Sequence, residues 1–263
     1  MNISRLFFAV ILLLSFVSCR KTETQTVQSG NVAFRINHCV DGLPVRENEL
    51  IYTNAAGNQY SITGIQYFIS DITFYRPDGS SSMIQQPKSI FYINEDIPAT
   101  RDLVFSDKIP AGAYDSITFI FGIPEAKNKS FMFVNPPEVN MAWPEVLGGG
   151  YHYMMMDGKW SDPDGIIQSF AFHLGIGQLY HGEGHNTDSI YAFVQNYFKV
   201  SLPGSAFTLH KSDTLIFNLQ MNIENWFRDP HIYDHNQWGG MIMQNQDAMQ
   251  MIKENGWDAF SVL

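Results

Sequence analysis

The residues most able to do chemistry in this sequence are its 8 histidines and 12 methionines. His38 directly precedes Cys39, and His152 stands between two tyrosines and just before Met154–Met156. Imidazole combined with thioether or thiolate donors is a set that copper selects, because soft donors match a polarisable ion. Zinc would accept the imidazoles but gains nothing from methionine. If the protein binds a metal, this inventory therefore favours copper.

His173 lies near the end of a strongly apolar stretch, Ser169–Gly175. A buried ring nitrogen without a partner costs about 1–3 kcal/mol, so this imidazole needs either a backbone group or a metal. From spacing alone, a core histidine satisfied by the backbone is the better interpretation.

The remaining histidines have weaker claims as ligands. His181 and His185 lie in a glycine-rich loop and could share one ion only if that loop folds back. His231 and His235 lie in a polar loop, and His210 lies at the edge of an expected strand, where a structural role is favoured. The three adjacent methionines 154–156 alternate between faces of an expected strand, so at least one is expected in the core.

We find no hydrolase motif, no paired-cysteine motif and no phosphate-binding loop. A metal-dependent enzyme would need an open coordination position beside a general base, for which Glu145, Asp157 and Glu183 are the candidates. Nothing in the sequence selects a reaction, so we expect a protein that is not an enzyme.

The elements that must position these residues are strands. Short runs rich in Val, Ile, Phe and Tyr are separated by turn residues such as Pro77-Asp78-Gly79 and Asp162-Pro163-Asp164-Gly165. The expected strands are Val32–Val40, Ile65–Tyr75, Ser89–Tyr92, Tyr114–Phe121, Tyr151–Met156, Ile167–Leu174, Ile190–Leu202 and Thr214–Asn222. This pattern predicts an all-β fold, an antiparallel β-sandwich, with one short C-terminal helix over 246–255 ahead of Gly256.

The first 18 residues read as a signal peptide. Arg5 precedes an apolar run, Leu6 to Val17, that is shorter than the roughly 20 residues needed to span a bilayer. Phe16-Val17-Ser18-Cys19 resembles the lipobox of bacterial lipoproteins, which predicts lipidation of Cys19 and a membrane anchor. Residues 19–30 are then a flexible tether, and residues 31–263 form one domain, exported and held on the periplasmic or cell-surface side.

Charge and cysteine count narrow the partners. A net charge of −10 gives no electrostatic footprint for nucleic acid. If Cys19 is lipidated, Cys39 has no partner for an intramolecular disulfide. Cys39 is then a buried thiol, an intermolecular link or a soft metal ligand, and a small buried hydrophobe is the favoured interpretation.

Several segments, in this order, resemble the MbnP-like domain found in periplasmic proteins and in lipoproteins of the Bacteroidota. They are FRINHCVDGLPV, YTNAAGNQYSITGIQYFISDI, IPAGAYDSITFIFGIP, NMAW, GGGYHYMMMDG, FHLG and NGWDAFSV. The resemblance covers nearly the whole chain from Val32 to Val262.

The resemblance implies a copper-binding protein that acts as carrier, scavenger or sensor. It also implies a dihaem peroxidase-like partner that oxidises a tryptophan, here Trp143, to kynurenine. The family's histidine positions fall on His38 and His173, and the Gly-Gly-Gly-Tyr-His run adds His152 as a ligand candidate.

Four further residues are second-tier metal candidates: Cys39, Met141, His181 and His185. Glu145 stands where the family commonly has a second tryptophan. The alternative function is a metal-free surface module that recognises protein or glycan, and it predicts an exposed Trp226 or Trp238.

Overall fold

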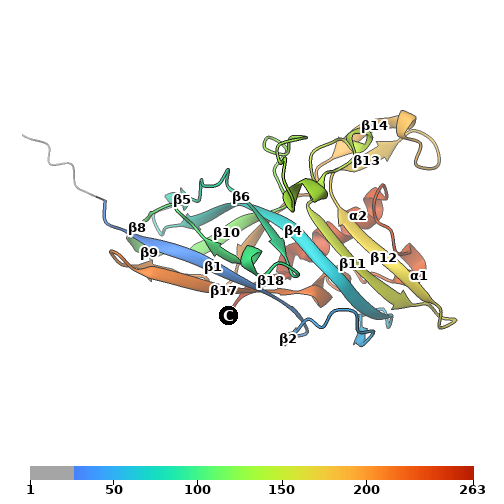
Figure 1. The fold of residues 1–263 in the computed structure, drawn as a ribbon, viewed down its shortest axis with the longest axis horizontal. Helices are drawn as coiled ribbons and strands as arrows, with labels where there is room; N and C mark the ends of the chain where they lie inside the picture. Colours follow the sequence, from blue (N-terminus) through green and yellow to red (C-terminus); the bar gives the residue numbers. More distant parts are fainter. Residues whose placement is uncertain (1–26) are drawn as a thin grey trace, which may run out of the picture.

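In the computed structural model, two β-sheets lie face to face, and the structure describes residues 27–263. The smaller of these sheets has the order β18-β17-β1-β2, with β7 and β8 also pairing with β1 (Figure 1). Its strands are β1 (Ser29–Val40), β2 (Leu43–Pro44), β7 (Asp102–Val104), β8 (Ile109–Pro110), β17 (Thr214–Asn222) and β18 (Phe260–Val262). The predicted signal peptide lies outside the described residues, as do Cys19 and most of the predicted tether.

The larger sheet has the order β12-β11-β4-β10-β15, with β3, β5 and β6 also pairing with β4. Its strands are β3 (Tyr52–Thr53), β4 (Gln59–Tyr75), β5 (Ser81–Met83), β6 (Ile90–Asn94), β10 (Ser116–Phe121), β11 (Met154–Ser161), β12 (Ile167–Leu174) and β15 (Phe198–Leu202). The strand β12 is therefore an edge of this path, and it pairs along its full length with β11.

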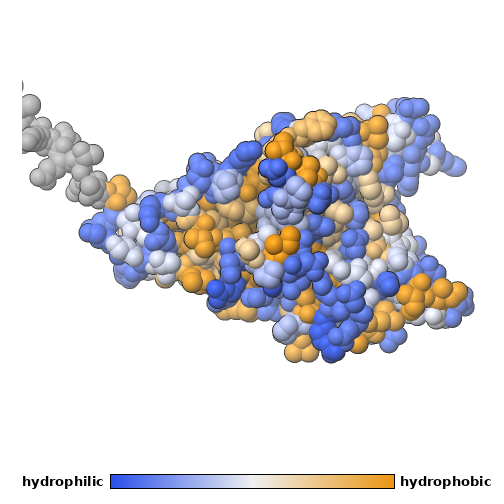
Figure 2. Space-filling model, viewed as in Figure 1, coloured by the Kyte–Doolittle hydropathy of each residue, from blue (hydrophilic) through white to orange (hydrophobic). Residues whose placement is uncertain are grey.

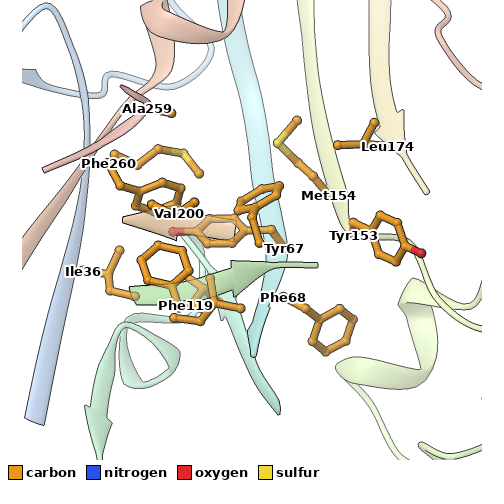
Figure 3. Packing of buried hydrophobic residues seen from close by; sticks show 14 of the residues in the cluster. Ile36, Tyr67, Phe68, Phe119, Tyr153, Met154, Leu174, Val200, Ala259 and Phe260 are labelled. Carbon is orange, nitrogen blue, oxygen red and sulfur yellow. The ribbon is translucent and has the colours of Figure 1, made fainter. Parts of the chain in front are cut away.

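The core fills the space between the two sheets. Ile36 from β1 and Phe260 from β18 meet Tyr67, Phe119 and Met154 of the larger sheet (Figure 3). Buried and half-buried residues alternate along β12, as expected when one face of a strand packs in the core. The same alternation decides on which face each candidate ligand lies.

Smaller elements cover the ends of the sandwich. The strands β13 (Gly177–Tyr180) and β14 (Ile190–Val194) form a hairpin, and β9 (Gly112–Tyr114) pairs with β16 (Phe207–Leu209). The helices are α1 (His235–Trp238) and α2 (Gln246–Asn255), and six short 3-10 helices lie in the connections of the described chain: η1 (Pro98–Thr100), η2 (Glu138–Met141), η3 (Glu145–Leu147), η4 (Thr187–Ser189), η5 (Ile223–Phe227) and η6 (Gly256–Asp258). Within residues 27–263, no helix is both long and apolar enough to cross a membrane.

The predicted all-β sandwich with a C-terminal helix over 246–255 is confirmed. Several details differ from the expectation. The strand β4 begins at Gln59 rather than at residue 65, the expected strand Tyr114–Phe121 is divided between β9 and β10, and the expected strand Tyr151–Met156 is β11, Met154–Ser161. The pair β1–β17 is parallel, since the end of the chain returns to the first strand in the same direction. The expected strand Ile190–Leu202 is two strands, β14 and β15, because Asn196 turns inward and donates a hydrogen bond to the carbonyl of Gly175 (3.0 Å).

Candidate metal centre

Trp143, His152 and His173 meet at one end of the larger sheet. The ring centroids of His152 and His173 are 5.1 Å apart, and those of Trp143 and His152 are 4.6 Å apart, both edge to face. Three of the residues singled out in the sequence thus form one contiguous group, which we call the Trp-His-His cluster.

The first member, Trp143, lies in a connection whose path depends on glycines. Gly148, Gly149 and Gly150 all adopt positive φ, between +66° and +115°, which explains the unusual run of three glycines. The Trp143 indole is almost fully buried and donates from Nε1 to the carbonyl of Leu147 (3.0 Å). A bridge between Ala142 and Tyr151 brings His152 beside the indole.

One ring nitrogen of His152 is already used. Its Nδ1 lies 2.9 Å from the carbonyl oxygen of Met141, and a carbonyl can only accept, so Nδ1 carries the proton. The other nitrogen, Nε2, is buried and has no hydrogen-bond partner among the described residues. Burial lowers the pKa of His152 to about 4, so the ring is neutral at pH 7 and Nε2 presents a free lone pair.

His173 shows the complementary arrangement. Its neighbours Phe172 and Leu174 point into the core, so His173 lies on the outer face of β12. Its Nε2 lies 3.1 Å from the Asp157 carboxylate, which is an acceptor when ionised, so Nε2 is the donor. With Nε2 as the donor to Asp157, Nδ1 is the nitrogen left for a metal.

Methionines surround this pair unevenly. Met154 and Met156 are fully buried in the core, as expected for at least one of the three adjacent methionines. Met155 is half-buried, pairs directly with His173 across β11 and β12, and shares its outer face. Met141, a second-tier candidate, is buried and contacts His152 through its backbone carbonyl.

His38 is not part of this group. It faces the core from β1, where its Nδ1 bonds Glu95 Oε2 (2.6 Å) and its Nε2 bonds the Tyr67 hydroxyl (2.9 Å). Both nitrogens are thus occupied, and Arg101 supports Glu95 from 3.2 Å. Because His38 lies on the inner side of the larger sheet and His173 on its outer face, the two do not converge on one ion.

The structure therefore corrects the expectation of a single three-histidine site. Over residues 27–263, no group of three or more His, Cys, Asp or Glu side chains is placed to hold one metal ion. His152 and His173 come together, and His38 bridges the two sheets instead. The pairing of His38 with Glu95 joins positions far apart in the chain, which neither composition nor local spacing indicates.

The other candidates are dispersed. Cys39 is a buried free thiol beside Gln220 and Asn222 on the smaller sheet. His181 stacks on Tyr191 and His185 lies tilted beside Tyr180, so each ring packs against a tyrosine of the exposed hairpin.

The remaining histidines and the candidate bases for an enzyme occupy different parts of the structure. His210 is exposed and His231 bonds Glu254. Of the possible bases, Glu183 lies in the exposed hairpin loop, Glu145 begins η3, and Asp157 contacts His173.

His235 differs from the expectation of an exposed loop residue. It is 1% exposed and packs against Trp160, Phe170, Phe172 and Tyr233. The sequence hint for this burial is the aromatic run of β12, because a loop that packs against an aromatic strand can insert one ring of its own between the aromatic side chains.

The alternative surface module predicted an exposed Trp226 or Trp238. Trp226 is fully buried against Phe121 and Phe198, and Trp238 is half-buried beside Tyr233. Neither tryptophan offers the open aromatic face that this alternative requires.

Comparison with known proteins agrees with the resemblance found in the sequence. The solved structure of MbnP from Methylosinus trichosporium is similar, with a TM-score of 0.51 and 15% identity over 78% of this chain and 80% of that chain. At this identity the likeness concerns the fold. No curated protein sequence matches. The sequence model of the MbnP family matches residues 29–246, which is most of the chain, and the protein therefore belongs to the MbnP family.

Proposed function

We propose that the protein is an exported, non-enzymatic copper-binding protein and that His152 and His173 hold the ion. The observation that carries this proposal is the buried Nε2 of His152, which has no hydrogen-bond partner within residues 27–263, in a ring that contacts the ring of His173. An unsatisfied buried nitrogen costs about 1–3 kcal/mol, and a metal bond would remove that cost.

The hydrogen bonds that hold the two imidazoles support the same function. Metal-binding histidines commonly donate their other ring N–H to a carboxylate or a backbone carbonyl, which fixes the tautomer and aims the lone pair. Asp157 does this for His173, and the carbonyl of Met141 does it for His152. Each ring therefore keeps its second nitrogen as a potential donor, and imidazole donors suit copper.

Trp143 adds a third group to the proposed site. The edge-to-face contact with His152 means that a tryptophan oxidised to kynurenine would present an amine and a ketone next to the imidazole. The family resemblance is the reason to propose this oxidation and the dihaem peroxidase-like partner that performs it. We likewise propose that a lipid on Cys19 anchors the domain outside the cytoplasm.

The test is metal stoichiometry in purified protein loaded with copper. Wild type is compared with His152→Ala, His173→Ala and His38→Gln, and elemental analysis counts bound copper. We expect both alanine variants to lose the ion and His38→Gln to retain it. Undiminished copper in the two alanine variants would refute the proposed site. Mass spectrometry of protein from its native host would reveal the mass change of kynurenine at Trp143.

A further inference from the structure

The hairpin of β13 and β14 projects from the sandwich beside α2 (Figure 1). Along β14 exposed residues alternate with half-buried ones, so this strand buries little apolar surface. A two-stranded hairpin is at best marginally stable on its own in water. A neighbouring segment holds this one, because the Tyr180 hydroxyl donates to Oε1 of Gln244 (3.2 Å), two residues before α2.

A cavity of about 300 Å³ lies between the hairpin and the first residues of α2. This volume is at the lower end of the range for small-molecule sites, roughly 300–1,000 Å³. Gly182 and Gly184 line the cavity with positive φ, +79° and +85°, which the turn at the end of the hairpin requires. Mostly hydrophilic residues cover this end of the hairpin (Figure 2), so the cavity suits a small polar ligand.

One wall of the cavity is fixed by hydrogen bonds within the protein. Asn245 caps α2 by accepting from the amide of Ala248 (3.1 Å). The side-chain amides of Gln246 and Asn196 exchange two hydrogen bonds of 3.1 Å, and Asn196 is fully buried. A wall that is already ordered lowers the entropic cost of binding.

The other lining side chains include aromatic rings and polar groups. Tyr191 is 56% exposed and Tyr180 is half-buried. The carboxylate of Asp247 is exposed, and Gln244 accepts from Tyr180 through its amide oxygen, which leaves its NH₂ group as a donor. The ring of His185, tilted beside Tyr180, can donate or accept. The cavity thus combines apolar ring surfaces with both donors and acceptors.

The charge of the walls limits the class of ligand. Of the described residues that line the cavity, Asp247 is the one carboxylate and none is a lysine or an arginine. An anionic ligand would meet a like charge without a guanidinium or ammonium group to pair with. A hard divalent cation would need several oxygen ligands, whereas this cavity offers a single carboxylate. A neutral ligand that carries several hydroxyl groups avoids both problems.

We propose that this cavity binds a neutral mono- or disaccharide. The C–H face of a pyranose ring packs on a tyrosine ring, and its hydroxyls, each a donor and an acceptor, match the Asp247 carboxylate and the Gln244 amide. The lining residues include no member of the Trp-His-His cluster, and neither Trp226 nor Trp238. The sugar site therefore does not depend on the proposed copper function.

The test is saturation-transfer NMR on the full-length protein in the presence of EDTA. The probes are glucose, galactose, N-acetylglucosamine, maltose and cellobiose, with glucuronate as the charged comparison. We expect saturation transfer to the ring C–H protons of at least one neutral sugar and less transfer to glucuronate. Absence of transfer to all five neutral sugars would overturn the proposal, and so would a stronger signal from glucuronate than from each of them.

Variants locate the binding. Tyr191→Ala and Asp247→Asn change exposed side chains, and we expect each to weaken sugar binding about tenfold. Trp257→Ala is the matched control, because it removes another exposed ring, 62% exposed, from η6. Wild-type affinity in both cavity variants, or lost binding in Trp257→Ala, would overturn the site. The copper stoichiometry of all three variants should equal that of wild type, so the sugar site and the copper site are tested separately.

Discussion

His152 and His173 contact each other edge to face, with ring centroids 5.1 Å apart. His152 follows the glycine-rich loop Gly148–Gly150, whereas His173 lies near the end of the edge strand β12. Each ring has one nitrogen held by an oxygen acceptor, and Nε2 of His152 is buried with no hydrogen-bond partner in the described part of the chain. A buried histidine with no ligand would gain from bonding its second nitrogen to water or to the backbone. This arrangement leaves the buried lone pair of His152 available instead.

Asp157 is expected to tune the affinity for copper without touching the ion. Replacing it with alanine removes the acceptor for Nε2 of His173, so the ring loses both its orientation and part of its basicity. Loss of a carboxylate that holds a metal-binding histidine typically costs about 10–100-fold in metal affinity. Competition with a copper chelator would measure this, and Asp157→Asn, which keeps an oxygen acceptor, should recover part of the loss. Equal affinities in wild type and Asp157→Ala would contradict the assigned role.

Gly175 is expected to be essential for the position of Trp143. A Cβ at Gly175 would lie 2.6 Å from Cε3 of the indole and 2.7 Å from Cζ3, so the ring would have to move. We expect Gly175→Ala to lower stability by about 1–3 kcal/mol and to weaken copper binding by shifting the neighbour of His152.

Gly64→Ala is the matched control for Gly175→Ala, because a Cβ there would meet no atom within 4 Å. Thermal denaturation and copper titration of the two variants check the prediction. A Gly175→Ala protein as stable as Gly64→Ala would show that Trp143 can relax at no cost.

Much of the fold follows from local patterns in the sequence. Ile167–Leu174 and Thr214–Asn222 have the predicted bounds because alternation and flanking turns mark them clearly. The helix α2 also has its predicted bounds, since the side chain of Asn245 caps it by accepting from the amide of Ala248. The parallel pairing of β1 with β17 joins the two ends of the domain, and no local pattern indicates it.

The site was only partly predictable for a related reason. Alternation along a strand indicates that His173 opposes Phe172 and Leu174, but it does not say which long-range partner a histidine meets. His38 bonds Glu95 and Tyr67 through contacts between sheets, which removed it from the expected ligand set. His152 could be identified from its setting among aromatic residues and methionines, whereas its contact with His173 depends on the tertiary path of the loop.

His235 is expected to destabilise the protein in mild acid. Its two ring nitrogens are buried and find no hydrogen-bond partner among residues 27–263, and burial lowers its pKa from 6.5 to about 4. As the pH falls from 6.5 to 4, the unfolded chain gains a proton that the folded protein does not bind, so stability falls.

Replacing His235 with phenylalanine removes this proton linkage and fits the surrounding aromatic rings. We expect His235→Phe to be more stable than wild type at pH 7.5 and to exceed it by more at pH 4.5. Chemical denaturation at the two pH values measures both gains. His152 titrates over the same range in both proteins, so it cancels from the comparison. A gain that does not grow in acid would exclude the linkage.

Glu224 is expected to have the opposite dependence on pH. Its carboxylate is buried, accepts hydrogen bonds from Tyr60 and from the amide of Ala55, and has a pKa raised from 4.5 to about 7, chiefly by burial. Between pH 4.5 and 7 the folded protein therefore binds more protons than the unfolded chain, and stability falls as the pH rises through this window.

The amide of Glu224→Gln stays neutral at every pH and can still accept from Ala55 and contact Tyr60. We expect this variant to match wild type near pH 4.5 and to be more stable at pH 8, with the difference growing up to about pH 7 and constant above it. Denaturation midpoints across this range provide the measurement. A difference independent of pH would mean that Glu224 stays ionised in the folded protein, and that Arg228 compensates its burial.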